Sequence, residues 1–420
     1  MPWDRLADEH MPDFFNVLTP EQALEVIRQR VTARVASETV PTTEALARVT
    51  AVDQAAPEDL PAFPRSTMDG FSVRAADTFG ASEGLPAYLD VVGDIPAGRQ
   101  AGVELATGQA ATAYTGGMLA VGADAVVMVE NTQSLDGTTI EVVRPVAPGE
   151  NIVQVGEDVK RGDPVVETGR VLRPQDLGGL LALGVTSVTV ACRPRVAIVS
   201  TGDELVPPEA KPGPGMIRDI NTYTVSALVE KAGGIPVPVA LVEDDYESQK
   251  AAAMQALELG DLVVFSAGSS VSTRDLTARV IDDMGRPGVL IHGVSLKPGK
   301  PTIFGLADST PAFGLPGNPV SAMVVFDLLV RPTIYRLAGC IRPPEPSTVQ
   351  AVLARDVPSQ AGREDFVPVR VLGENGRLSA EPVFGKSNLI NTLVAADGTI
   401  RVPLNKGGLY AGEPVSVRLF

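Results

Sequence analysis

The sequence has few cysteines and histidines and only 5% aromatic residues. Its two cysteines, Cys192 and Cys340, lie far apart and outside any Cys-x-x-Cys pattern, which argues against a disulfide framework and a cysteine zinc site. The two histidines, His10 and His292, are too few for an imidazole-rich metal site. Any bound metal is therefore expected to have oxygen ligands, with magnesium as the first candidate.

Basic charge and long apolar runs are also scarce. The chain has 35 Lys and Arg against 51 Asp and Glu, a net charge of −16, whereas nucleic-acid binding requires a basic surface. We therefore expect no nucleic-acid partner, and an anionic substrate must be held by local basic groups and backbone N–H donors. No apolar run has the length of a membrane span, and the acidic N-terminal segment MPWDRLADEH does not resemble a secretory signal. The expectation is a cytoplasmic protein with no membrane contact.

Glycine and proline are abundant, at 41 and 35 residues, and 420 residues are too many for a single core. The apolar patterns indicate four domains. These are a discontinuous mixed α/β domain (1–65 and 147–192), an inserted β-rich domain (66–146), a central α/β domain with a parallel sheet (193–340), and a small C-terminal β-barrel (345–420).

Apolar strands and amphipathic helices alternate through the central domain, which is typical of a parallel sheet covered on both faces. The predicted strands are 195–201, 237–242, 261–265, 289–292 and 312–315, and the predicted helices are 221–232, 246–259, 274–284 and 319–337. Two more helices are predicted at 19–31, with Thr19 as N-cap and Pro20 in the first turn, and at 174–183. Asp136-Gly137 predicts a hairpin turn in the inserted domain.

Small and charged residues follow the predicted strands of the central domain. In an open parallel sheet, ligands bind beyond the carboxyl ends of the strands. The loops that leave those ends are Ser200–Glu204, Glu243–Asp245, Ser266–Ser270, Lys297–Pro301 and Leu315–Pro319. Each loop alone has an ordinary explanation, such as a solvated turn or a serine helix cap. Together they predict an anion pocket, with N–H groups and lysines for phosphate and acids for a metal.

Further motifs lie outside that domain and complete an ordered set. The set consists of Ser66–Phe71 with its central Met-Asp-Gly, Thr115-Gly116, Gly122–Met128, Gly156-Glu157-Asp158, Ser200–Leu205, the Lys-Pro-Gly-Lys-Pro loop and Leu-Pro-Gly-Asn-Pro-Val-Ser-Ala. In this order and spacing, the chain resembles the molybdopterin molybdenumtransferase family, the MoeA family that includes the C-terminal domain of gephyrin. The resemblance covers nearly the whole chain.

The resemblance implies a molybdopterin-binding α/β domain, an elongated homodimer, and an active site between the α/β domain of one subunit and the inserted domain of the other. It implies that adenylyl-molybdopterin and molybdate give molybdenum cofactor and AMP, with magnesium as cofactor and a molybdopterin adenylyltransferase as a possible partner. The catalytic positions it implies are Asp69, Thr115, Asp158, Glu204, Asp244, Asp275, Lys297 and Lys300, with Glu204, Asp244 and Asp275 as the candidate magnesium ligands. The binding positions are Thr201, Gly202, Asp203, Ser266, Gly268, Ser269, Ser270, Pro298, Gly299, Pro301, Pro316, Gly317, Asn318 and Ser387.

Three departures from the family pattern indicate a divergent branch. Serine at Ser272 replaces a glycine of the serine loop and constrains its backbone. Gly293 stands where many members have a basic residue, and Lys386 next to Ser387 can return that charge. Tungstate, which is nearly isosteric with molybdate, therefore stays open as the substrate. Two other functions also stay open, an adenylyltransferase acting on the same pterin and a non-catalytic carrier of the pterin or cofactor.

Overall fold

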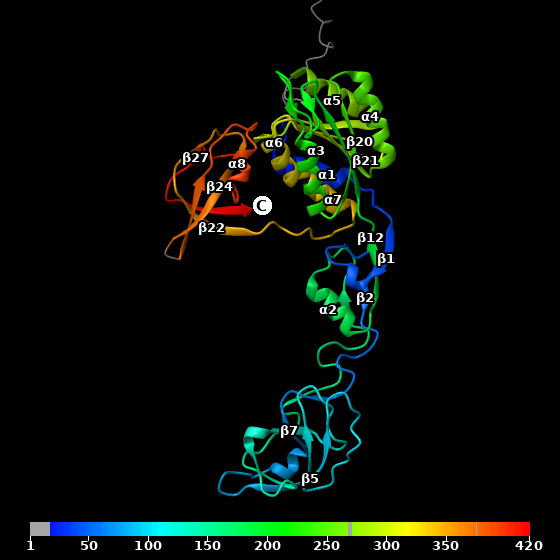
Figure 1. The fold of residues 1–420 in the computed structure, drawn as a ribbon, viewed down its shortest axis with the longest axis vertical. Coiled ribbons are helices and arrows are strands. Elements are labelled where there is room, and N and C mark those ends of the chain that lie inside the picture. Colours follow the sequence, from blue (N-terminus) through cyan, green and yellow to red (C-terminus); the bar gives the residue numbers. More distant parts are fainter. Residues whose placement is uncertain (1–16, 268–270, 375) are drawn as a thin grey trace, which may run out of the picture.

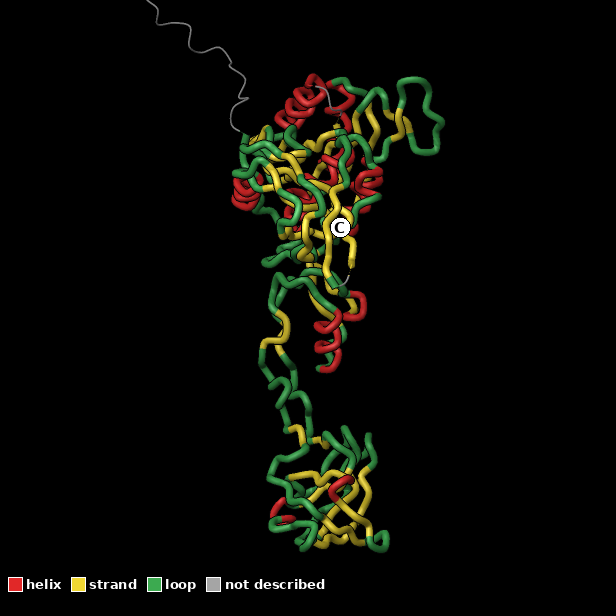
Figure 2. Tube along the Cα trace, turned by 90° about the vertical axis from the view of Figure 1, so that its left-hand side faces the viewer, coloured by secondary structure: helices red, strands yellow, loops and turns green. Residues whose placement is uncertain are grey.

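The computed structural model describes residues 17–267, 271–374 and 376–420. The molecule is long, with a β-rich lobe at one end, a narrow middle region, and a wide body at the other end (Figures 1 and 2). The wide body contains the central sheet with its helices and, beside it, the C-terminal barrel. The chain is therefore a multidomain α/β protein, as predicted.

The central sheet has six strands. Their order is β16 (Ile235–Val242), β13 (Arg195–Thr201), β17 (Leu262–Ala267), β21 (Thr310–Pro316), β20 (Ile303–Ala307) and β18 (Pro287–His292). The first four are parallel, which confirms the predicted parallel sheet. At the other edge, β20 pairs antiparallel with β21 and β18 pairs antiparallel with β20, so that β20 alone runs against the other strands of this sheet. The sequence did not predict β20, a five-residue strand that turns back at once into β21.

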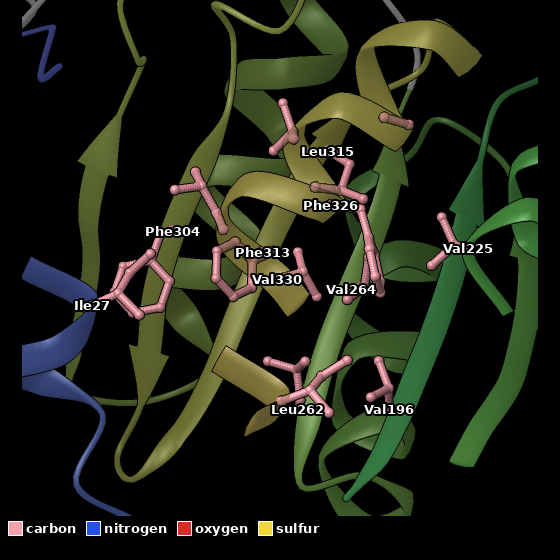
Figure 3. Packing of buried hydrophobic residues seen from close by; sticks show 14 of the residues in the cluster. Ile27, Val196, Val225, Leu262, Val264, Phe304, Phe313, Leu315, Phe326 and Val330 are labelled. Atoms are coloured by element: carbon pink, nitrogen blue, oxygen red, sulfur yellow. The ribbon is translucent and has the colours of Figure 1, made fainter. Parts of the chain in front are cut away.

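Helices cover both faces of this sheet. They are α3 (Asn221–Lys231), α4 (Tyr246–Leu259), α5 (Val271–Asp283), α6 (Pro319–Val325) and α7 (Arg331–Leu337), with the π-helical turn η4 (Phe326–Val330) between the last two. Because successive strand residues point to opposite faces, Val196 and Ile198 of β13 pack with α3, α6 and α7 (Figure 3), whereas Ala197 and Val199 pack with α4 and α5. Every helix predicted for this domain is present.

The N-terminal helix α1 (Pro20–Arg30) also packs on the central sheet. Thr19 accepts the Gln22 N–H and Pro20 stands at the first position, as predicted. Its buried residues Ala23 and Ile27 belong to the same core as α3 and α7. The chain then enters the narrow middle region, which has its own small core around Leu180. That region contains β1 (Ser37–Pro41), η1 (Thr42–Glu44), β2 (Gln54–Ala55), β11 (Pro164–Val166), α2 (Pro174–Ala182) and β12 (Ser187–Ala191).

The distal lobe is a six-stranded sheet with a separate core. Its order is β7 (Ala125–Met128), β4 (Gly70–Val73), β6 (Gln109–Ala113), β5 (Ala87–Ile95), β9 (Thr139–Val142) and β8 (Thr132–Ser134), with η2 (Ala75–Thr78) and η3 (Val129–Asn131) beside it. β3 (Arg65–Ser66) and β10 (Ile152–Val153) pair where the chain enters and leaves the lobe. Asp136 and Gly137 turn β8 into β9, and this confirms the predicted hairpin.

The C-terminal region is a closed barrel, as predicted. Strands β24 (Glu364–Glu374), β25 (Arg377–Pro382), β22 (Thr348–Leu353), β28 (Pro414–Leu419) and β26 (Gly398–Val402) are neighbours in this order, and β24 pairs with β26 to complete the ring. The remaining elements are β14 (Leu205–Val206), β15 (Ile217–Arg218), β19 (Leu296–Lys297), β23 (Val357–Pro358), α8 (Asn391–Val394) and β27 (Gly408–Leu409). Among all described helices, none combines the length and apolar character that crossing a membrane requires.

Candidate functional site

A cavity of about 680 Å³ lies between the central sheet and the barrel, and we call it the seam pocket. From the α/β domain it is lined by the loop Lys297–Pro301 and by Pro316, Asn318, Val320 and Ser321. From the barrel it is lined by Arg363, Asp365, the segment 383–387 and their apolar neighbours. The structure thus brings together eight predicted site residues, namely Lys297, Pro298, Gly299, Lys300, Pro301, Pro316, Asn318 and Ser387.

The barrel holds the lysine loop in place through backbone pairing. Strand β19 pairs in parallel with β24, so that Lys297 is opposite Asp365, and the Glu364 N–H donates to Ser295 O at 2.9 Å. Ser387 makes the second link between the domains. Its Oγ accepts Asn318 Nδ2 at 3.0 Å, and its carbonyl accepts the Val320 N–H at 3.2 Å. The lysine loop of the α/β domain is therefore held in place by the barrel.

The seam pocket is basic although the chain is acidic. The part of its lining that the structure describes carries four cations, Lys297, Lys300, Arg363 and Lys386, against a single carboxylate, Asp365. Asp365 is buried and engages two of the four, at 3.5 Å from Lys297 Nζ and 2.9 Å from Arg363 Nε. The remaining local excess of positive charge suits an oxyanion. Arg363 was not predicted as a site residue, because it precedes a barrel strand and comes to this pocket through the pairing of β24 with β19.

A second polar cluster lies at the carboxyl ends of β13, β17 and β21. Asn221 Nδ2 donates to Ser266 Oγ and to the Gly317 carbonyl, both at 2.8 Å, and so connects two predicted loops. Thr222 Oγ1 is 2.7 Å from Ser200 Oγ and donates to Asp219 Oδ2 at 2.5 Å.

Asp219, Asn221 and Thr222 were not predicted as site residues, because they look like an ordinary helix start. Buried Thr201 Oγ1 and Asn221 Oδ1 have no partner among the described residues, which is the state of groups that await a ligand or water. This cluster and the seam pocket share the Pro316–Asn318 loop.

The predicted magnesium ligands do not converge in this structure. Asp203 Oδ1 accepts the Asp244 N–H at 2.9 Å, which brings the loops after β13 and β16 together, and Glu204 and Gly202 lie in the first of these loops. Asp275 is an exposed residue of α5. Within residues 17–267, 271–374 and 376–420, no three His, Cys, Asp or Glu side chains form a group that could hold a metal. Gly268, Ser269 and Ser270, which were predicted to bind phosphate, lie outside the described residues.

Asp69 and Thr115 meet in the distal lobe. Asp69 Oδ1 accepts from the Thr115 N–H at 2.8 Å and from its Oγ at 2.9 Å, and these two bonds lower the pKa of the Asp69 carboxyl below its usual range. Both residues are exposed, and the lobe that carries them lies at the far end of the molecule from the central sheet (Figure 1).

Gly70 fixes this geometry. A Cβ there would lie 2.0 Å from the Val127 carbonyl oxygen, which explains why a glycine follows the aspartate. The third predicted acid outside the central domain, Asp158, is exposed at the root of the lobe, where its N–H donates to Leu60 O at 3.1 Å. Within one chain, therefore, these residues do not join the seam pocket.

A basic pocket beside the strand ends of an open α/β sheet, closed by a barrel, defines a protein that binds an anionic small molecule. Family models match along nearly the whole chain, the MoeA N-terminal region (domain I and II) at residues 18–184, the "Probable molybdopterin binding domain" at 197–336, and the MoeA C-terminal region (domain IV) at 350–420.

Relatives and solved structures agree with these matches. The molybdopterin molybdenumtransferase of Haemophilus influenzae is 34% identical over 406 residues, 96% of this chain and 99% of its own. That of Bacillus subtilis is 33% identical over 380 residues, 90% of this chain and 88% of its own. A crystal structure of the molybdopterin biosynthesis protein moeA from Pyrococcus horikoshii is 34% identical, with a TM-score of 0.83 over 96% of this chain and 100% of that chain. The chain belongs to the MoeA family.

Proposed function

We propose that this chain is a molybdopterin molybdenumtransferase, which uses molybdate and adenylyl-molybdopterin to produce molybdenum cofactor and AMP. Relatives that carry this name match at 33–34% identity over at least 90% of the chain. The observation that carries the proposal is the seam pocket, whose described lining has four cations and one carboxylate in a protein whose net charge is −16. Such a pocket attracts a tetrahedral dianion more strongly than a neutral or cationic substrate.

In this proposal the two neighbouring sites hold the two substrates. Lys297, Lys300 and Arg363 neutralise the oxyanion, and Lys386 adds charge from the barrel side. The strand-end cluster around Asn221 binds the pterin nucleotide, whose N–H groups can satisfy the buried acceptors there. Because the Pro316–Asn318 loop borders both sites, the oxyanion is held next to the pterin, and proximity itself accelerates the transfer.

The proposal includes a homodimer in which the distal lobe of one copy completes the site of the other. Asp69 and Thr115 form an exposed, internally bonded pair on a lobe that its own chain holds away from the sheet. In a dimer, the Asp69–Thr115 pair of one copy can contact the pterin nucleotide that is bound to the sheet of the other copy. Location in the cytoplasm and transfer of the substrate from an adenylyltransferase belong to the same proposal. Magnesium stays a prediction and no step is assigned to it, because its predicted ligands do not converge.

The test is AMP release from purified adenylyl-molybdopterin with molybdate, with tungstate, and with neither. Oxyanion-dependent release supports the transferase, and the more effective oxyanion identifies the metal. Tight pterin binding without release would instead establish a carrier, and ATP-dependent adenylylation of molybdopterin would establish the adenylyltransferase. In the same assay, Lys300→Met is expected to raise the KM for the oxyanion at least about tenfold, the effect of losing one charged contact. Lys231→Met is the matched control, since Lys231 ends α3 outside the seam pocket.

A further inference from the structure

Among the described residues that line the seam pocket, Asp365 is the only one with a carboxylate side chain. Its side chain is only 3% exposed, although Asp365 lies on β24 and lines the cavity. A buried acid in a pocket for a dianion opposes the binding of that dianion, because like charges repel. Its presence at this position therefore calls for a physical explanation.

The contacts of Asp365 show which cations it acts on. Oδ2 lies 3.5 Å from Lys297 Nζ and Oδ1 accepts from Arg363 Nε at 2.9 Å, so that each carboxylate oxygen faces one cation. The parallel pairing of β19 with β24 sets Lys297 directly opposite Asp365 and fixes this arrangement through the backbone. Lys300 and Lys386 also line the pocket but have no ion pair with Asp365. Asp365 thus offsets part of the charge of Lys297 and Arg363 and does not pair with the other two cations.

We propose that Asp365 is a positioning residue that sets the oxyanion affinity of the seam pocket. It holds Lys297 and Arg363 at the barrel side and weakens their attraction for the anion, so that the oxyanion is captured reversibly and can be handed on to the pterin. This inference rests on the proposed function. A substrate that must leave its first site is transferred poorly when that site binds it too tightly, because ground-state binding adds to the barrier.

The proposal predicts the direction in which substitution of Asp365 changes the affinity of the seam pocket for an oxyanion. Removing the negative charge of Asp365 leaves four cations and no carboxylate in the described lining of the pocket, and the affinity for any dianion rises. A damaged pocket would bind more weakly, so tighter binding cannot arise from misfolding. The substituted chain is also expected to fold, because the two released cations are not buried. Their side chains are 57% exposed for Lys297 and 34% exposed for Arg363.

The test uses the full-length protein and measures the Kd of sodium tungstate, sodium molybdate and sodium sulfate by calorimetry without any pterin. For Asp365→Asn we expect the Kd of all three to fall about tenfold, or about 1.4 kcal/mol, and to depend more steeply on salt concentration. Asp365→Glu keeps the charge and is expected to stay within about threefold of the unchanged protein.

The matched control is Glu364→Gln on the same strand. Glu364 is also buried and is ion-paired with Arg401 at 2.6 Å, but neither residue is among those that line the seam pocket. Its substitution should leave the three Kd values unchanged. An unchanged or increased Kd in Asp365→Asn would overturn the inference, as would an equal decrease in Glu364→Gln.

The binding measurement separates this inference from the proposed function. If the unchanged protein binds tungstate and Asp365→Asn binds it more tightly, but no AMP is released from adenylyl-molybdopterin, the transferase fails and the inference stands. If AMP release depends on oxyanion while Asp365→Asn does not bind the oxyanion more tightly, the transferase stands and the inference fails. On the proposed function, Asp365→Asn also lowers the KM for molybdate and lowers kcat, because the tighter complex releases its oxyanion more slowly.

Discussion

Asp327 anchors the barrel on the α/β domain through two arginines. It lies in the π-helical turn η4, where it pairs with Arg331 of α7 at 2.8 Å, and it also pairs with Arg418 of the barrel strand β28. Arg331 Nη1 donates in addition to the Pro344 carbonyl, in the linker that leads to the barrel, at 2.9 Å. Burial lowers the pKa of the Arg418 guanidinium below its ordinary value, which marks this pair as partly desolvated. Asp327 therefore connects α7 with the barrel, and its partner Arg331 extends the contact to the linker.

We predict that the Asp327–Arg418 pair contributes about 1–2 kcal/mol to barrel docking. Charged hydrogen bonds contribute about 1.5–3 kcal/mol and exposed ion pairs about 0.2–1 kcal/mol. This pair lies between the two cases, because the side chains are 38% and 26% exposed. Hydrogen exchange of the β28 amides measures the opening free energy of the barrel locally, which a multidomain unfolding curve does not.

The measurement is a double-mutant cycle with Asp327→Asn, Arg418→Met and the combined variant. The coupling energy should be about 1–2 kcal/mol. Arg355→Met, which removes an exposed barrel ion pair with Glu381, is the control and should change the opening energy by less than about 0.5 kcal/mol. Strictly additive losses in the cycle would refute the anchoring role.

Three predictions concern the predicted acids and their surroundings. Asp69→Asn and Asp275→Asn should each abolish AMP release while leaving tungstate binding unchanged, and release at the normal rate would remove the residue from the catalytic set. Thr115→Val removes one of the two hydrogen bonds that lower the pKa of Asp69, so that this pKa should rise. The acid limb of the kcat/KM profile should then move to higher pH. An acid limb at the same pH in Thr115→Val would contradict this prediction. Gly70→Ala should open the distal lobe, because the new Cβ meets the Val127 carbonyl, and hydrogen exchange in β4 and β7 should rise while that in the central sheet stays constant.

Local sequence patterns predicted most of the secondary structure. Thr19 and Pro20 mark the start of α1, and Asp136-Gly137 marks the turn between β8 and β9, because caps and turns depend on side chains only a few residues away. The apolar runs of the central domain identified its parallel strands, since those strands are buried on both faces. The strand β20 was not predicted, because it has only five residues and no alternation of polar and apolar side chains that would distinguish it from the loop before it.

The sequence predicted which loops form the site, but not the residues that other parts of the fold add to it. Lys297 and Lys300 were identified from their own motif, whereas Arg363 and Asp365 lie more than sixty residues later in a different domain. The pairing of β19 with β24 brings them together, and such a long-range contact leaves no periodicity in the sequence. Asn221 was missed for another reason. Its role depends on the positions of Ser266 and Gly317, which the tertiary fold determines.

The seam pocket is formed by two domains, so its affinity for an oxyanion depends on whether the barrel is docked on the α/β domain. Lys297 and Lys300 come from the α/β domain and Arg363 and Lys386 from the barrel, so that only the docked state has all four cations. The observed Kd is then the intrinsic Kd divided by the docked fraction. If docking is favoured by about 3 kcal/mol, the loss of about 2 kcal/mol in Asp327→Asn still leaves roughly 80% docked. The Kd of tungstate should therefore rise by less than about twofold, even though β28 exchanges faster. A tenfold rise would require a barrel that is mostly undocked after one ion pair is removed, and this would contradict the view that the β19–β24 pairing and the Ser387 contacts keep the barrel docked without that ion pair.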